Sequence, residues 1–381
     1  MIKLNKILLI HAVLILLYVL TAGCADSKDI NNKSILTAIA LDKKDDEIYL
    51  YVEIANVEGS NKSEGKNGGK GHKYIYIKSH GKTIPEAREN LNKQLEKQPY
   101  LSAVRSLIFT EAFAKEYLVE YLYRVRADEL YRKKTVTVIT KEDPEELFKV
   151  SNEKNESAGF SIEDMLNTLE NAGESFSRTT SRLLENLSNR YTGIIIPCIG
   201  LQNEDIILSG YSVINGTTIT GFIPAEESKG TIFFKTDQPK FSFIIPYKDN
   251  NLTIETSLKK RKIKPSYKNK KINYDMKFNF EATLMYGNKK TPYNFNEAAN
   301  KEVTKILTEM LKKELTDAVE QAQKKYKCDY LQFDDYFRVK FPVEFEKMDW
   351  ENEFSKAGYN IDVKVKLTGT YMMDYETNEQ K

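Results

Sequence analysis

The chain has 381 residues, of which 57 are Lys or Arg and 55 are Asp or Glu, so its formal net charge at pH 7 is only +2. Charges this evenly balanced do not favour nucleic-acid binding, and they argue against steering of a strongly charged ligand. The length allows two or three domains with their own cores. Beyond Cys24, we expect Cys198 and Cys328 to be buried thiols, because their spacing matches no metal site or redox pair. A single disulfide between them is the alternative.

The first 24 residues follow the order of a bacterial lipoprotein signal peptide. Lys3 and Lys6 precede an apolar stretch at 7–20 that is too short to cross a bilayer as a helix. Residues 20–24 read Leu-Thr-Ala-Gly-Cys and resemble a lipobox, in which small residues precede a lipidated cysteine. We therefore expect residues 1–23 to be removed and lipid on Cys24 to hold the chain at a membrane. An ordinary signal peptide, or an uncleaved anchor, with a chance cysteine is the alternative.

The next part of the chain predicts alternating strands and helices. Apolar and β-branched runs predict strands at 34–41, 47–57, 73–79, 102–109, 134–140 and 194–197. Capping residues and apolar spacing predict helices at 83–98, 110–123 and from 143, and a helical hairpin at 161–190. Residues 59–71, mainly Gly, Asn, Lys and Ser, predict a mobile loop. Because several strands are close enough to form hairpins, we expect an α+β fold rather than a doubly wound parallel sheet.

The remaining part is richer in strands. Asn215-Gly216 predicts a tight turn between strands at 206–214 and 217–222. Further strands are expected at 231–234, 241–246, 252–264, 272–284 and 361–367. Between the last two lies a long amphipathic helix, 296–327, whose apolar stripe includes Leu311. We expect this stripe to cover the domain's own sheet, with a coiled-coil partner as the alternative.

The predicted organisation is consecutive domains of mixed β-sheet flanked by helices. A signal peptide at 1–23 precedes an N-terminal domain at 24–200 and a C-terminal domain at 204–375 that contains the long helix. A further division of the N-terminal domain near residue 145 stays open.

The sequence contains no pattern that indicates catalysis. His72 and His80 match no metal-ligand motif, and neither a phosphate-binding glycine loop nor a nucleophile elbow is present. The acid pairs Asp334-Asp335 and Glu226-Glu227 are typical of exposed surface. We therefore expect no catalytic residue, no metal site and no cofactor. Direct binding of a small molecule is left open.

Several segments, taken in order, resemble a known family. Residues 37–42, Thr-Ala-Ile-Ala-Leu-Asp, are similar to its strand "ALGID", and residues 208–213 and 221–230 are similar to its glycine patterns "G-x-A-V-F" and "G-x-L-x-x-x-E-T-R-G". Residues 262–265 match its "K-I-K-P". These segments resemble the Ger(x)C family, the lipoprotein C subunits of spore germinant receptors. The sequence departs from the family pattern at Ala25, where the family has Trp, and at Asp334, where it has Gly.

The resemblance implies an α+β protein without enzymatic activity. Family members lie on the outer surface of the spore's inner membrane and act with integral-membrane A and B subunits in triggering germination by nutrients. The functional residue that carries over is the lipidated Cys24. A solute-binding lipoprotein of a transporter is the alternative function, because it has the same kind of anchor on a large soluble body.

Overall fold

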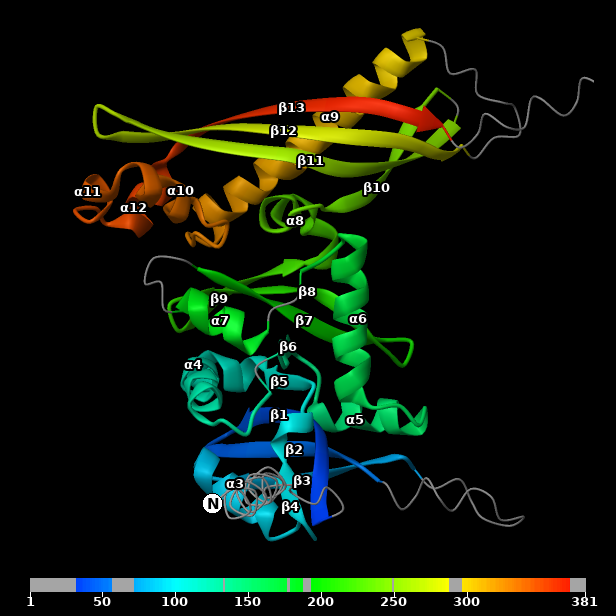
Figure 1. Cartoon of the computed structure of the whole chain (residues 1–381), viewed down its shortest axis with the longest axis vertical. Helices are drawn as coiled ribbons and strands as arrows, with labels where there is room; N and C mark the ends of the chain where they lie inside the picture. Colours follow the sequence, from blue (N-terminus) through cyan, green and yellow to red (C-terminus); the bar gives the residue numbers. More distant parts are fainter. Residues whose placement is uncertain are drawn as a thin grey trace, which may run out of the picture.

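A computed structural model describes residues 32–56, 72–132, 134–176, 179–187, 193–248, 250–287 and 297–370. The predicted signal peptide, Cys24 and the predicted loop at 59–71 lie outside these residues. The chain forms two sheets that follow one another along the long axis of the molecule (Figure 1).

The larger sheet has nine strands and occupies the lower and middle parts of Figure 1. The strands are Lys33–Lys44 (β1), Glu47–Ala55 (β2), Tyr74–Gly81 (β3), Gln98–Tyr100 (β4), Ser106–Thr110 (β5), Val136–Thr140 (β6), Ile194–Gln202 (β7), Asp205–Asn215 (β8) and Thr218–Pro224 (β9). They are ordered β3-β2-β1-β5-β6-β7-β8-β9, and β4 pairs with β1 beside this path. The central strands β1, β5, β6 and β7 are parallel, whereas the strands on either side are antiparallel. This mixed sheet confirms the expected α+β class.

Helices cover both faces of the larger sheet. They are Ile84–Asn92 (α3), Glu111–Ala127 (α4), Pro144–Glu153 (α5), Ala158–Ala172 (α6) and Thr180–Leu187 (α7). Alternate side chains of β1 point to opposite faces. Ile39 and Leu41 pack in a cluster with residues of α3, α4 and α7. Ala38 and Ala40 pack in a second cluster with residues of α5 and α6.

The smaller sheet has four strands in the order β10-β11-β12-β13 and lies at the top of Figure 1. Its strands are Lys240–Tyr247 (β10), Asn250–Lys268 (β11), Lys271–Gly287 (β12) and Gly358–Thr370 (β13). The long helix Glu297–Glu320 (α9) crosses one face of this sheet and continues into a π-helical turn, Gln321–Lys325. Three short helices follow, Phe333–Lys340 (α10), Pro342–Phe345 (α11) and Trp350–Lys356 (α12).

The predicted stripe of α9 faces the interior. Val303, Leu307, Leu311, Leu315 and Val319 are at most 1% exposed and pack in one cluster with the smaller sheet. The prediction that the stripe covers the domain's own sheet is therefore confirmed.

Three predicted features differ in the structure. The predicted helical hairpin at 161–190 is wrong, because α6 and α7 pack on opposite faces of the larger sheet. The predicted strand at 231–234 is wrong, because these residues belong to the helix Lys229–Lys235 (α8). The side chains of all four residues from Thr231 to Phe234 are buried. The sequence therefore lacks the alternation of apolar and polar residues that would distinguish a half-buried strand from a buried helix. The predicted helix 83–98 ends at Asn92, and Gln98–Tyr100 instead pairs with β1.

The hairpin around Asn215-Gly216 joins the larger sheet, since β8 pairs with β7. The larger sheet thus extends beyond residue 204, where the sequence places the start of a second domain. The domain boundaries near residues 145 and 200 stay predictions.

A buried carboxylate fastens α6 to the larger sheet. Glu53 of β2 is 2% exposed and accepts hydrogen bonds from the Thr37 hydroxyl at 2.6 Å and the Ser157 hydroxyl at 2.5 Å. It also accepts the backbone N–H groups of Ala158 at 2.7 Å and Gly159 at 3.3 Å, which begin α6. A carboxylate at the positive end of a helix satisfies these otherwise unpaired donors.

A second buried carboxylate organises the end of the C-terminal part. The Asp329 carboxylate accepts the backbone N–H groups of Phe333 at 3.0 Å and Asp334 at 2.7 Å, and the Trp350 indole N–H at 3.0 Å. Asp334 itself is fully buried, so the prediction that the Asp334-Asp335 pair is exposed is wrong for its first member. Burial, together with the charge of Asp334, raises the pKa of Asp329 above its usual range.

We predict that Leu311→Asp unfolds the C-terminal part, because a carboxylate cannot be solvated within the cluster beneath α9. The melting temperature of the variant, followed by circular dichroism, checks this. Lys312→Asp is the matched control, since it places a carboxylate on the exposed side of the same helix. An unchanged melting curve for Leu311→Asp would show that the stripe is accessible to water.

We predict that Glu53→Ala lowers the free energy of unfolding by about 2–4 kcal/mol, because four buried donors lose a charged acceptor. Urea unfolding measures the difference. Glu156→Ala removes an exposed carboxylate next to the same helix end and should change the free energy little. Equal effects from the two variants would contradict the role of Glu53.

We predict that Asp329 makes the protein less stable as pH rises. A carboxyl group whose pKa is raised by folding contributes stability at pH values below its unfolded pKa, and this contribution is lost as pH rises through the folded pKa. Relative to wild type, Asp329→Asn should therefore lose less stability between pH 5 and pH 8, by roughly 1 kcal/mol or more. Urea unfolding at both pH values tests this. The control is Asp335→Asn, at a half-buried carboxylate that pairs with Arg338 instead. Parallel pH profiles for wild type and Asp329→Asn would refute the prediction.

Candidate functional site

The predicted lipidation site, Cys24, lies outside the described residues, but the position of the first strand bears on it. β1 begins at Lys33, nine positions after Cys24. Nine residues span at most roughly 30 Å when extended. Within the described ranges, no helix has the length and apolar character needed to cross a membrane.

The two histidines singled out from the sequence bind different parts of the chain. His80 lies 3.0 Å from the Glu47 carboxylate and stacks on the Tyr49 ring. The Nδ1 atom of His72 lies 3.3 Å from the backbone oxygen of Asn152. Among residues that the structure describes, no group of three or more His, Cys, Asp or Glu side chains is arranged to hold a metal ion.

Both described cysteines are free and buried, so the structure favours two thiols over the alternative disulfide. Cys198 lies in β7 with its Sγ atom 2.9 Å from the Ser212 hydroxyl. Cys328 directly precedes Asp329, and its Sγ atom lies 3.6 Å from the backbone oxygen of Ile214. Burial raises the pKa of each thiol to about 12, so both are protonated and weakly nucleophilic at neutral pH.

The glycines that carry the family resemblance lie where two backbones or a backbone and a ring approach closely. A Cβ atom on Gly221 of β9 would lie 2.1 Å from the Tyr326 ring, and one on Gly230 of α8 would lie 2.0 Å from the Glu314 carbonyl oxygen. The Tyr326 hydroxyl donates to the Phe222 carbonyl at 2.6 Å. These motif residues therefore join elements of the fold, and their arrangement offers no catalytic group.

A cleft of about 480 Å³ opens where β6 ends. Glu111 and Lys115 of α4, Lys141 after β6 and Phe222 of β9 are among its lining residues. Glu111 pairs with Lys115 at 2.8 Å and with Lys141 at 3.8 Å, and Lys141 lies over the Phe222 ring. The opposite charges of the cleft are thus largely paired with one another.

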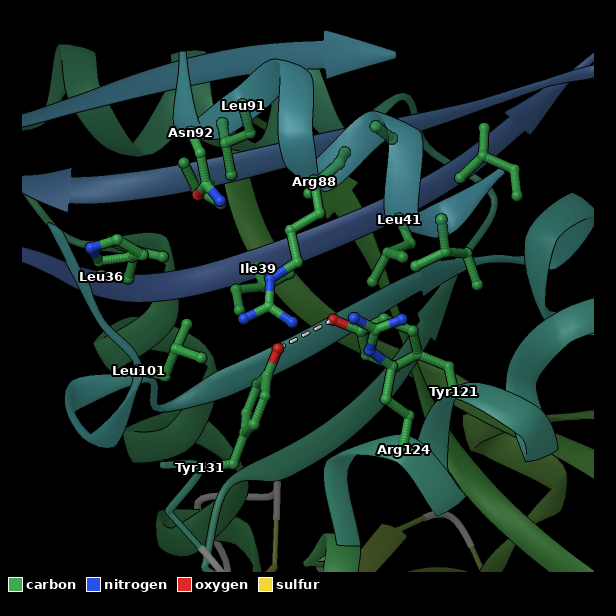
Figure 2. A pocket seen from close by; sticks show the side chains of 16 residues that line it. Leu36, Ile39, Leu41, Arg88, Leu91, Asn92, Leu101, Tyr121, Arg124 and Tyr131 are labelled. Carbon is green, nitrogen blue, oxygen red and sulfur yellow. Dashed lines mark hydrogen bonds between the residues drawn. The ribbon is translucent and has the colours of Figure 1, made fainter. Parts of the chain in front are cut away.

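A second pocket lies between β1, β2 and the helices α3 and α4 (Figure 2). Most of its wall is apolar, formed by aliphatic side chains such as Ile39, Leu41 and Leu91. Its polar groups are Asn92, two arginines, Arg88 of α3 and Arg124 of α4, and two tyrosines. The sequence offered no signal for this pocket, because the arginines are 36 positions apart on different helices.

The two tyrosines of this pocket, Tyr121 and Tyr131, are 4% and 8% exposed, and their hydroxyl oxygens lie 3.3 Å apart. Burial raises the pKa of both side chains, whereas the nearby charges of Arg88 and Arg124 act in the opposite direction. Figure 2 shows both guanidinium groups close to the hydrogen-bonded hydroxyls. The four polar side chains therefore form one cluster.

Two family models match this chain. Residues 26–201 match the spore germination protein N-terminal domain, and residues 209–371 match the spore germination B3/GerAC-like C-terminal domain. Together they cover most of the chain.

Curated relatives and a solved structure agree with these matches. The chain is 20% identical to spore germination protein B3 of Bacillus subtilis (strain 168) over 357 residues, covering 91% of this chain and 93% of that protein. It is 21% identical to spore germination protein YndF of the same organism over 399 residues, covering 96% and 97%. The fold resembles the crystal structure of the GerBC protein with a TM-score of 0.56 at 16% identity, covering 86% of this chain and 96% of that one. The chain therefore belongs to the Ger(x)C family of spore germination proteins.

Proposed function

We propose that the mature chain is the C subunit of a nutrient germinant receptor and is held on the outer surface of the spore's inner membrane by lipid on Cys24. It acts without catalysis, by forming a complex with integral-membrane A and B subunits. The observation that carries this proposal is the match of both family domains, over residues 26–201 and 209–371, directly after a lipobox-like segment.

The arrangement of the chain supports a lipid anchor. Residues 20–24, Leu-Thr-Ala-Gly-Cys, supply the small residues and the thiol that lipidation requires. Each buried methylene of an acyl chain contributes about 0.8 kcal/mol, and two chains suffice for stable attachment. A diacylglyceryl group on Cys24 would thus hold the folded body within a short tether of the lipid surface.

The chemistry of the described residues supports a role in assembly. The buried ionisable groups Glu53 and Asp329 are used to fasten helices, and both buried thiols are protonated. These four groups thus serve packing, as expected for a subunit that presents a stable surface to its partners.

We predict that spores lacking this gene lose the response to at least one nutrient. The measurement is release of dipicolinic acid in a strain whose other receptor operons have been deleted, so that no second receptor masks the loss. A copy of the wild-type gene at the same locus is the control and should restore release. Normal release in the deletion strain would refute the receptor role.

The same strain tests the anchor and the partners. Cys24→Ala should shift the protein out of the spore membrane fraction and abolish the nutrient response, because the lipid attachment is lost. A tag on the wild-type protein should co-purify the A and B subunits from spore membranes. If instead the deletion impairs uptake of a solute and leaves germination intact, the chain is the solute-binding lipoprotein of a transporter.

A further inference from the structure

The cleft at the end of β6 lies where proteins with parallel strands commonly bind ligands. β5 and β6 are parallel neighbours, and the helices that follow them, α4 and α5, cover opposite faces of the larger sheet (Figure 1). Such a change of face leaves a crevice at the carboxyl ends of the strands. Glu111 directly follows β5, Lys141 directly follows β6, and both line the cleft. Its volume of about 480 Å³ is within the range of small-molecule sites.

Two β-bulges place hydroxyl groups along this cleft. Ser209 is an extra residue of β8 in its pairing with β7, and Thr220 is an extra residue of β9 in its pairing with β8. Both residues line the cleft. Their hydroxyls donate to the backbone oxygens of Cys198 at 3.1 Å and Val213 at 3.3 Å, so the lone pairs of both hydroxyl oxygens remain as acceptors. Bulges are frequent beside functional sites because they re-aim a side chain.

The end of β6 has hydrogen-bonding capacity that the described part of the chain does not use. Thr140 is 1% exposed, and its hydroxyl accepts the Glu142 backbone N–H at 3.0 Å but has no acceptor there for its own proton. The Lys141 ammonium lies 3.8 Å from the Glu111 carboxylate, too far for a hydrogen bond. The Glu142 carboxylate forms no ion pair with a described residue, and its contact with the Leu201 backbone N–H is 3.5 Å long. Unused donors and acceptors therefore lie side by side.

The charges of the cleft limit the class of ligand. Its lining contains two carboxylates, Glu111 and Glu142, and two ammonium groups, Lys115 and Lys141. Because these charges balance, a ligand with a net charge would leave an excess. Both ammonium groups lie beside Glu111, whose charge opposes the approach of a second carboxylate, including that of a zwitterion. The balance therefore favours an uncharged ligand.

The wall of the cleft also has an apolar part. Ile219 and Phe222 of β9 are half-buried and line it. A ligand that carries only polar groups would leave this part in contact with water, whereas the C–H face of a ring would cover it. Each hydroxyl on the edge of such a ring can both donate and accept a hydrogen bond. An uncharged ring with several hydroxyls thus matches the whole lining.

We propose that this cleft binds a small uncharged polyol of the size of a monosaccharide. Its hydroxyls donate to the Glu142 carboxylate and to the hydroxyl oxygens of Ser209 and Thr220, and they accept from Thr140 and Lys141. Its C–H face lies against the apolar part of the wall. The site is separate from the lipid anchor, and its test does not depend on the proposed receptor function, because binding is measured on the purified chain.

Binding by the full chain, purified in a polyoxyethylene ether detergent that carries no sugar, tests the proposal. Equilibrium dialysis with radiolabelled D-glucose, D-fructose and myo-inositol measures occupancy, and micelles without protein give the blank. At least one of these polyols should bind at one site per chain at millimolar concentration. Cyclohexanol, which has a ring and a single hydroxyl, and L-alanine, a zwitterion, should each bind at least about tenfold more weakly than the best polyol.

A pair of substitutions at the end of β6 identifies the site. The double variant Lys141→Gln with Glu142→Gln keeps the net charge of the chain and should weaken binding of the best polyol by about tenfold or more, since two charged hydrogen-bonding groups are lost. Glu346→Gln with Lys347→Gln is the matched control, because these adjacent residues are exposed and do not line the cleft. This control should bind as wild type does.

The melting temperature of each variant without ligand reports on folding. Lys141 is exposed and Glu142 is half-buried, so the double variant should melt close to wild type. The proposal is overturned if no polyol binds, if cyclohexanol or L-alanine binds as tightly as the best polyol, or if the folded double variant keeps wild-type affinity. If the double variant melts well below wild type, Thr220→Val decides, because it removes a hydroxyl and keeps the shape of the side chain: weakened binding supports the proposal, and unchanged affinity overturns it.

Discussion

The short segment 326–330 links the two sheets, and Asp329 lies at the centre of that link. Its side chain orders the start of α10 and holds the Trp350 indole, while its backbone oxygen accepts the N–H of Gly193 at 3.2 Å, just before β7. Tyr326 and Cys328 make parallel contacts with β9 and with the end of β8. A carboxylate that is fully removed from water is tolerable only because three donors surround it. The same segment explains why Gly221, one of the residues that resemble the family pattern, has no room for a side chain, since a Cβ there would lie 2.1 Å from the Tyr326 ring.

This use of buried polar groups bears on function. Glu53 and Asp329 are the carboxylates that a search for acid–base chemistry would examine first, yet each is committed to the beginning of a helix. The cleft beside β6 pairs its own charges. The arginine pocket differs from these sites because its charges lack a partner among the described residues. No guanidinium nitrogen of Arg88 or Arg124 is both buried and without a partner, so water can solvate these charges.

Much of the fold followed from local patterns. The stripe of α9 was predictable because a helix of this length repeats its apolar positions several times. The turn after Asn215 was predictable because glycine readily adopts a positive φ, and Gly216 has a φ of 59°. The strand prediction for residues 231–234 was wrong because a four-residue apolar run has no period that separates a strand from a buried helix. The prediction that Asp334 is exposed was wrong. Adjacent acidic residues are usually solvated, and nothing in the sequence spacing showed that Asp334 lies close to Asp329. The arginine pocket could not be predicted, because Arg88 and Arg124 meet only after α3 and α4 pack on the same face of the sheet.

The sequence by itself determined the properties that depend on neighbouring residues: the order of charge, apolar stretch and small residues before Cys24, the amphipathic helix, the hairpin turn and the order of the family segments. Only the tertiary structure decided that β8 and β9 extend the larger sheet, that α8 is a helix, and that two arginines share one apolar pocket. The physical reason is that strand pairing, burial and the neutralisation of charge are settled between residues far apart in the chain. The spacing of apolar residues indicates which face of a helix or strand is buried, but the tertiary packing determines which element covers that face.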